Sequence, residues 1–214
     1  MWTASSLGYK DIVEVLISNG ADINSTDVCD RNPLWVASNN NHADIVELLI
    51  SSGADTNKPD EGGITPMHNA SREGNTNIMA LLISSRADIN GADEDGITPL
   101  HMASRERSTN IVELLIESKA AIDKAADNGD TPLIFAALEN RMTTVRLLVE
   151  SGADITIRGD ENKTTDEWAK QEGHTEIAKF LQDHWNFHVK LEIERLRVFP
   201  TDLIGIITGY AQKL

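Results

Sequence analysis

A six-residue motif recurs in this chain at a fixed spacing, and that spacing constrains the fold more than any other feature. The motif Thr-Pro-Leu-His-Met-Ala occupies residues 98–103, and a close copy occupies residues 65–70. Three looser copies begin at residues 32, 131 and 164, so consecutive copies always lie 33 residues apart. A constant period of this length predicts one elongated array of stacked repeats and not a set of separate globular domains.

The residue types in the motif favour the first turn of a helix. Proline has a φ of about −65° and no N–H to lose, so it suits the first helical position. The threonine before it can act as the N-cap. We interpret His68 and His101 as structural, with side chains that reach back to nearby backbone and hydroxyl groups. The equivalent residues in other copies are Trp35 and Ile134, which could replace neither a metal ligand nor a base.

A second apolar pattern follows each copy of the motif. Residues 45–50 read Ile-Val-Glu-Leu-Leu-Ile, and residues 12–17 and 111–116 are near copies. Apolar residues at this spacing predict a second helix with one buried face. A glycine such as Gly53 predicts the left-handed end of that helix. The Ala-Asp-x-Asn run after it leads into a finger, which we expect the asparagine, for example Asn57, to hold by a hydrogen bond.

Residues 92–124, which are repeat four when the partial repeat at residues 1–25 is counted as repeat one, depart from this pattern at two turns. Arg107 stands where Gly74 stands in the repeat before, and Lys119 stands where Gly53 stands. If these positions stay left-handed, each non-glycine residue there costs about 1 kcal/mol. Repeat four is therefore predicted to be the least stable internal unit.

With this period, motif and finger, the chain resembles the ankyrin-repeat family. The resemblance implies an all-α solenoid of helix–turn–helix units with short β-hairpin fingers. It divides the chain into an ankyrin-repeat domain, residues 1–184, and a helical C-terminal tail or cap, residues 185–214. Within the domain we expect a partial repeat followed by five further repeats: 1–25, 26–58, 59–91, 92–124, 125–157 and 158–184.

The chain is strongly acidic, and its charge lies in the repeats. The formal net charge is −15, whereas residues 183–214 contain four acidic and four basic residues. Such a surface repels phosphate groups and anionic lipids, so we expect neither a nucleic-acid partner nor a membrane partner. A basic protein partner would suit the surface better.

The single cysteine, Cys29, excludes an internal disulfide and favours a reducing compartment. No run of 18 apolar residues is present, and the first residues lack the basic and apolar segments of a signal peptide. We therefore expect a monomer in the cytoplasm. A nuclear location is also consistent, as is the host cytosol for a secreted effector or a viral protein.

No motif predicts catalysis or a cofactor. A Gly-rich phosphate loop is missing, and no Ser-His-Asp or Cys-His set stands at a recognisable spacing. His184 and His188 are four residues apart and could share one helix face, but a metal site needs further ligands and only Asp183 lies nearby. We expect no enzyme activity, no metal site and no cofactor.

Ankyrin proteins usually contact partners through the fingertips and the exposed face of the first helices, and the resemblance places this surface on the chain by alignment. Most of its residues are acidic or polar, and an Arg-Glu pair at the same place in repeats three and four suggests a ladder of paired charges. We expect the apolar Ile64, Ile97 and Leu138 to be exposed and to contribute most to binding. A merely solvated face is the alternative at each position. The set comprises Arg31, Asn39, Asn40, Glu61, Ile64, Arg72, Glu73, Glu94, Asp95, Ile97, Arg105, Glu106, Asp127, Asp130, Leu138 and Glu139, and repeat six adds Asp160, Glu161, Lys163, Gln171 and Glu172.

Residues 198–207 resemble the opening of an F-box and the F-box-like tail of poxviral ankyrin proteins. This resemblance implies a helix that docks into the adaptor of a cullin-based ubiquitin ligase. Its anchors would be Phe199, Pro200, Leu203, Ile204 and Ile207. The alternative, which we favour, is that the same residues fold back and cap the last repeat.

Two functions remain open. The first is a non-catalytic scaffold or adaptor that binds a basic protein through an acidic concave face. The second is the substrate-recognition subunit of a ubiquitin ligase, which would use the F-box-like tail.

Overall fold

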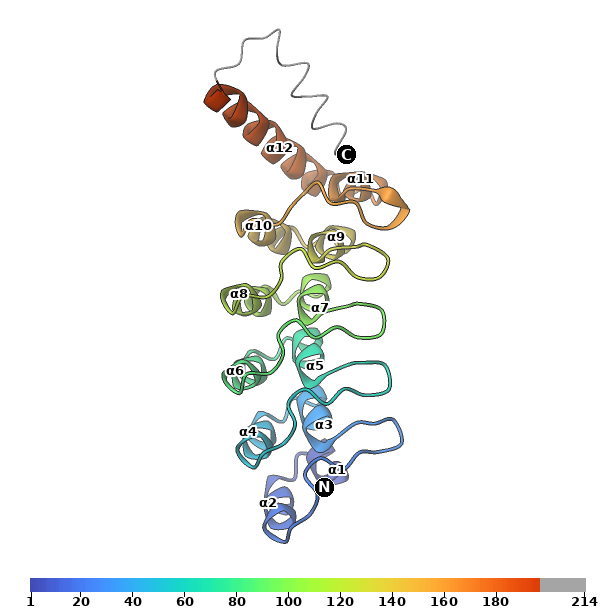
Figure 1. Ribbon diagram of the computed structural model, residues 1–214, viewed down its shortest axis with the longest axis vertical. Coiled ribbons are helices and arrows are strands. Elements are labelled where there is room, and N and C mark those ends of the chain that lie inside the picture. The colour runs from blue at the N-terminus through green and yellow to red at the C-terminus, as the bar shows by residue number, and fades with distance from the viewer. Residues whose placement is uncertain (197–214) are drawn as a thin grey trace.

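The structure is a computed structural model that describes residues 1–196, with side chains through residue 191. Twelve α-helices within this range form an elongated stack of antiparallel pairs, with a row of finger loops along one edge (Figure 1). The first helices of the pairs are α1 (Trp2–Ser6), α3 (Pro33–Asn39), α5 (Pro66–Glu73), α7 (Pro99–Arg105), α9 (Pro132–Leu138) and α11 (Thr165–Gln171). The second helices are α2 (Lys10–Ser18), α4 (Ala43–Ser51), α6 (Thr76–Ser84), α8 (Thr109–Glu117), α10 (Met142–Glu150) and α12 (Thr175–Leu196). A short 3₁₀ helix, η1 (Asp160–Asn162), lies in the last finger.

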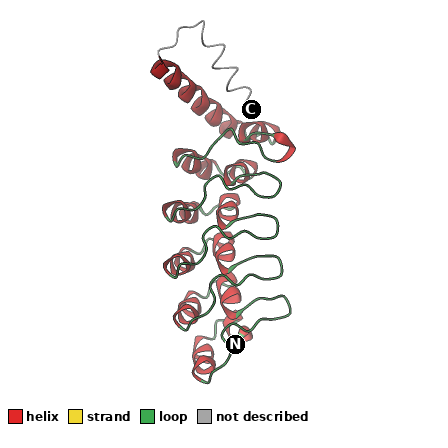
Figure 2. Ribbon diagram, in the orientation of Figure 1, coloured by secondary structure: helices red, strands yellow, loops and turns green. Residues whose placement is uncertain are grey.

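The all-α solenoid is confirmed, but the expected β-hairpins are not present in residues 1–196 (Figure 2). Each finger is a tight turn with two or three backbone hydrogen bonds across it. In repeat four the N–H of Asp93 donates to the carbonyl of Ile97 at 2.9 Å, and the N–H of Gly96 donates to Asp93 at 3.1 Å. A finger this short has room for a turn but not for the repeated pairing that a strand ladder requires.

The histidines of the motif are structural, as the sequence predicts. The Nδ1 atom of His68 accepts the backbone N–H of Thr65 at 3.1 Å, which closes the first turn of α5. Its Nε2 atom lies 3.0 Å from the carbonyl oxygen of Ile97, in the next repeat. In repeat two, the indole N–H of Trp35 reaches the carbonyl of Ile64 at 2.8 Å. Different side chains at one position therefore form the same link between repeats.

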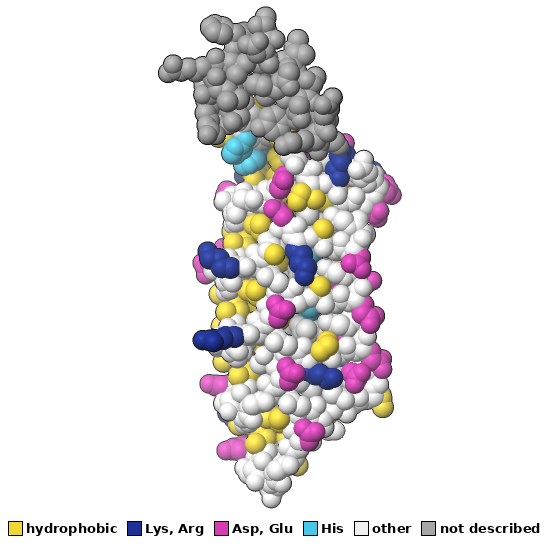
Figure 3. All heavy atoms as spheres, viewed as in Figure 1, with side chains coloured by type: hydrophobic (Ala, Val, Ile, Leu, Met, Phe, Trp, Pro, Cys, Tyr) yellow, Lys and Arg dark blue, Asp and Glu magenta, His cyan; other side chains and the backbone are white. Residues whose placement is uncertain are grey.

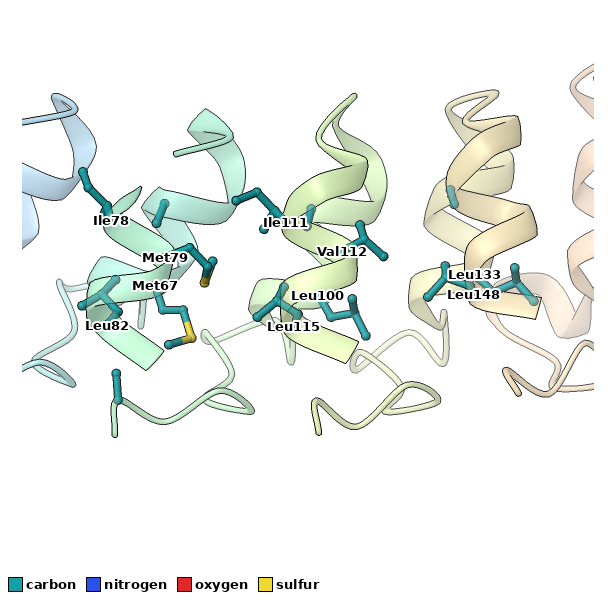
Figure 4. Packing of buried hydrophobic residues seen from close by; sticks show 14 of the residues in the cluster. Met67, Ile78, Met79, Leu82, Leu100, Ile111, Val112, Leu115, Leu133 and Leu148 are labelled. Carbon is teal, nitrogen blue, oxygen red and sulfur yellow. The ribbon is translucent and has the colours of Figure 1, made fainter. Parts of the chain in front are cut away.

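The core is a set of columns that run along the stack (Figure 4). On the second helices, Leu82, Leu115 and Leu148 lie 33 residues apart and are completely buried. On the first helices, Ala70 and Ala103 end the motif and are also completely buried. The small alanines let neighbouring first helices approach closely, while the leucines fill the space between the two helix layers.

The asparagine at the base of each finger holds the next repeat, as predicted. The Oδ1 atom of Asn57 accepts the backbone N–H of Asp88 at 2.7 Å, 31 residues further along the chain. Asn90 accepts the N–H of Ala121 in the same way at 2.8 Å. These bonds set the spacing between successive fingers.

The two unusual turns of repeat four differ from each other. Lys119 has a φ of +70°, so its left-handed conformation is confirmed. Arg107 does not have a positive φ, and the residue before it, Glu106, is extended with φ −82° and ψ 176°. The condition of a left-handed backbone therefore holds at Lys119 but not at Arg107, because the chain leaves α7 through an extended residue instead.

Helix α12 passes through residue 184 without a break and ends at Leu196. The helical preference of residues 185–196 is confirmed. The anchors proposed for docking or capping, which begin at Phe199, lie outside the described residues.

Candidate functional site

Neighbouring fingers are joined into a row by backbone hydrogen bonds. The N–H of Glu94 donates to the carbonyl of Gly62 at 3.2 Å, and the N–H of Asp127 donates to the carbonyl of Asp95 at 3.0 Å. The fingers approach so closely that a Cβ atom at Gly96 would lie 2.8 Å from the backbone nitrogen of Asp127. Glycine at this position, with a φ of +75°, is what permits the contact.

This row brings four acidic side chains together at equivalent positions of consecutive fingers. We call Glu61, Glu94, Asp127 and Asp160 the fingertip column. All four are exposed, and none forms an ion pair with any residue whose side chain the structure describes. The acidic side chains are visible along the edge formed by the finger loops (Figure 3). Repeat two has Val28 at the same position, where it is 92% exposed.

The ladder of paired charges at the ends of the first helices is present, but its two arginines differ. Arg72 donates to the Oδ1 atoms of Asn39 at 2.7 Å and Asn69 at 3.1 Å, as well as to Glu73 at 3.1 Å. Arg105 is exposed, and among the residues with described side chains its guanidinium pairs with Glu106 alone, with 3.6 Å between Nε and Oε1. Arg105 therefore keeps its guanidinium available for an incoming group.

Arg31 is held by its own repeat. It forms two hydrogen bonds to the Oδ2 atom of Asp27, at 2.6 and 2.9 Å, and the pKa of that carboxyl is lowered chiefly by them. The guanidinium also lies 5.5 Å from the ring centres of both Trp2 and Trp35. These contacts link Arg31 to the first helices of repeats one and two, so its role is structural.

The prediction that Asp130 belongs to the contact surface is wrong. It is only 4% exposed, so it does not lie on an accessible face. Its Oδ1 atom accepts the backbone N–H of Asp160 at 3.0 Å, and its Oδ2 atom accepts Asn128 Nδ2 at 2.7 Å. Both carboxylate oxygens therefore accept hydrogen bonds, one from the next finger and one from its own finger. The repeat pattern does not reveal this role, because the other repeats have a different residue at the position of Asp130.

The predicted apolar contacts, Ile64, Ile97 and Leu138, are half-buried, so the expectation that they are exposed is wrong. Two of them are covered in part because their carbonyls serve as acceptors for Trp35 and His68, which brings the neighbouring repeat close. Each still presents some apolar surface beside the polar residues.

The remaining predicted residues lie at the surface in varied settings. The Nδ2 atom of Asn40 donates to the carbonyl of Ser6 at 2.8 Å, and the side chain of Asn39 contacts Asn40. Glu139 is exposed and lies 3.9 Å from Arg141. In repeat six, Lys163 pairs with Glu161, bonds to Gln171 and covers the ring of Trp168 at 4.3 Å, whereas Glu172 is exposed.

A hollow of about 470 Å³ opens between repeats four and five. We call it the repeat 4–5 hollow. It is lined by Asp93, Asp95, Ile97, Met102, Arg105, Asp127, Asn128 and Phe135. The sequence reasoning identified four of these residues but missed Met102 and Phe135. A signal was present, since their position on the first helices, one residue beyond the histidine, holds valine, asparagine, methionine, phenylalanine and tryptophan in successive repeats.

Three of the histidines have lowered pKa values, and burial is the main cause in each. Burial lowers the pKa of His68, and it lowers the pKa of His101 to about 4. The rings of His184 and His188 lie 4.3 Å apart, and burial together with His188 lowers the pKa of His184. Among the residues with described side chains, no group of three His, Cys, Asp or Glu could hold a metal ion. No helix within residues 1–196 combines the length and the apolar character needed to cross a bilayer.

Comparison with known families agrees with this geometry. The family model for ankyrin repeats (3 copies) matches residues 1–93 and 87–159. A search of curated proteins found no match. The matched segments span most of the chain and contain the five helix pairs from α1 to α10, so the chain belongs to the ankyrin-repeat family.

Proposed function

We propose that this chain is a non-catalytic scaffold or adaptor that binds a basic protein through the fingertip column and the adjoining ends of the first helices. Ankyrin repeats form protein–protein interaction domains, and the family generally consists of binding scaffolds without catalytic activity. The proposal adds the surface that is used and the charge of the partner.

The fingertip column is the observation that carries the proposal. Hydrogen bonds between fingers hold its members at equivalent positions of consecutive fingers, and no cation with a described side chain pairs with them. Like charges along one edge repel one another, so this arrangement lowers the stability of the free protein slightly. A partner that brings lysine or arginine relieves the repulsion, and its approach is accelerated by the negative potential.

The second helices also have exposed acidic residues, and these provide a comparison. Glu14, Glu47, Glu113 and Glu150 are exposed on α2, α4, α8 and α10. They lie in the other helix layer, away from the fingers (Figure 1). If net charge alone attracted a partner, these residues would matter as much as the fingertip column.

The test is a selection of a phage-displayed random dodecapeptide library on the whole chain. The dissociation constants of the enriched peptides are then measured by fluorescence anisotropy at 50 and 300 mM salt. We expect the enriched peptides to be basic and to bind more weakly at high salt. A variant with all four residues of the fingertip column changed to lysine should bind at least tenfold more weakly.

The matched control changes Glu14, Glu47, Glu113 and Glu150 to lysine, which alters the net charge by the same amount. This variant should bind with an affinity within about threefold of the original chain. Equal weakening by both variants would contradict the proposed surface. Enriched peptides without excess positive charge, or no enrichment at all, would contradict the proposed partner.

A further inference from the structure

We infer that the repeat 4–5 hollow binds one apolar side chain of a protein segment that has lysine or arginine beside it. The inference rests on the proposed function and deepens it, because it names the chemistry of the partner at one place along the surface. The hollow has three chemically different sides, and each side selects a different part of the segment.

The floor of the hollow is apolar. Ile97 and Phe135 are half-buried, and Met102, which also lines the hollow, is almost completely buried. The ring of Phe135 meets the ring of His101 edge-on, with 5.1 Å between centroids, so its position is fixed before a partner arrives. A rigid, partly exposed aromatic floor is suited to an aliphatic or aromatic side chain.

The finger side of the hollow is anionic. Asp95 and Asp127 are exposed, and the backbone bond of 3.0 Å between their fingers keeps them adjacent. Neither carboxylate has an ion-pair partner among the residues with described side chains. A lysine or arginine next to the bound apolar residue would meet both carboxylates at once.

The helix side of the hollow presents Arg105. The equivalent Arg72 is occupied by two asparagine side chains, Asn39 and Asn69. For Arg105 the equivalent neighbours, 33 residues after Asn39 and Asn69, are Arg72 of repeat three and Met102 of repeat four, which offer no amide oxygen. Arg105 can therefore donate to a carbonyl or carboxylate of the bound segment. The segment is thus oriented, with its cation toward the fingers and an acceptor toward α7.

The experiment uses the basic peptides enriched on the whole chain, measured against single variants. Phe135→Asn introduces the residue that repeat three has at this position, and Met142→Asn changes a half-buried apolar residue of the same repeat that lies on α10, outside the hollow. We expect Phe135→Asn to weaken binding about tenfold and Met142→Asn to weaken it less than threefold. Replacing the apolar residue of the peptide by serine should weaken binding to the original chain. The same replacement should not weaken binding to the Phe135→Asn variant any further, because that variant has already lost the contact.

A second variant covers the case in which Phe135→Asn fails to fold. Arg105 is exposed, so Arg105→Glu should fold normally, and peptides selected on it should gain a basic residue on the helix side. Equal effects of Phe135→Asn and Met142→Asn, or unchanged peptide preference with Arg105→Glu, would overturn the inference.

The outcomes also separate this inference from the proposed function. If reversal of the fingertip column abolishes peptide binding while the hollow variants leave it unchanged, the proposed function stands and this inference fails. If neither set of variants affects binding, or no peptide is enriched, both fail.

Discussion

The Nε2 atom of His101 lies 3.1 Å from the carbonyl oxygen of Asp130, in the next finger. The backbone N–H of Thr98 donates to Nδ1 of the same ring at 3.1 Å, so Nδ1 has no proton and Nε2 is the donor. One neutral imidazole thus closes its own helix and fastens the next repeat. A second proton on the ring would face the N–H of Thr98.

This arrangement makes the stability of the array depend on pH. Burial lowers the pKa of His101 to about 4, below its unfolded value of about 6.5. Between these values the unfolded chain binds a proton that the folded chain does not, so stability is lost as the pH falls. Lowering the pH from 7.5 to 5 should reduce the free energy of unfolding by about 2 kcal/mol through this residue. Urea unfolding at the two pH values measures it.

The control for this prediction is His101→Gln, which has no titrating group. It should be less stable than the original chain at pH 7.5, and the difference should shrink at pH 5. A difference that is the same at both pH values would show that His101 titrates normally.

Lys119→Gly should stabilise the chain by about 0.5–1 kcal/mol. The φ of +70° at Lys119 is unfavourable for any residue with a Cβ atom, and glycine removes that penalty at the expense of some entropy in the unfolded chain. Arg107→Gly is the matched control, because Arg107 is not left-handed and should gain nothing. Thermal unfolding of the two variants measures the difference, and an equal rise in both melting temperatures would contradict the backbone assignment.

Ser104→Ala should leave the chain equally stable or stabilise it by up to about 1 kcal/mol. The hydroxyls of Ser71 and Ser104 are buried without a hydrogen-bond partner among the described residues, and repeat five has Ala137 at the same position. A buried hydroxyl without a partner lowers stability. The reverse change, Ala137→Ser, should therefore lower the free energy of urea unfolding. A clear loss of stability in Ser104→Ala would indicate that the hydroxyl has a partner.

Asp130→Ala should lower stability, whereas Asp127→Ala should weaken peptide binding, although the two residues lie only three positions apart. Loss of the buried Asp130 carboxylate leaves the N–H of Asp160 without its acceptor and should lower stability by about 1–3 kcal/mol. Asp127 is exposed, so its loss should change stability by less than about 0.5 kcal/mol but weaken the binding of basic peptides. Urea unfolding and fluorescence anisotropy on both variants decide the matter. Weaker peptide binding with unchanged stability in Asp130→Ala would return that residue to the contact surface.

Features that depend on the repeat itself could be predicted from the sequence. The Thr-Pro pair predicts where the first helices begin. The hydrogen bonds of His68 and Asn57 to the next repeat can be predicted because successive repeats pack against one another in the same way. The sequence also placed Glu61, Glu94 and Asp127 at equivalent fingertips. Their adjacency needs only a constant period.

Features that depend on departures from the repeat could not be predicted. Asp130 turns inward because Asp160 and Asn128 offer it donors, and no pattern in one repeat reveals them. The extended Glu106 and the hollow beside Phe135 arise from how one irregular turn and one aromatic ring pack against their neighbours. These local departures from the repeat make the surface of this chain differ from that of a regular array.

The most direct test of the proposed interaction surface is the location of a bound peptide on the chain. Amide chemical shifts of the ¹⁵N-labelled protein, recorded with and without an enriched basic peptide, would locate it. We expect the largest changes at the fingertip column and on α5, α7 and α9, and small changes on α4, α6 and α8. Changes concentrated on the second helices, with the fingers unaffected, would contradict the account.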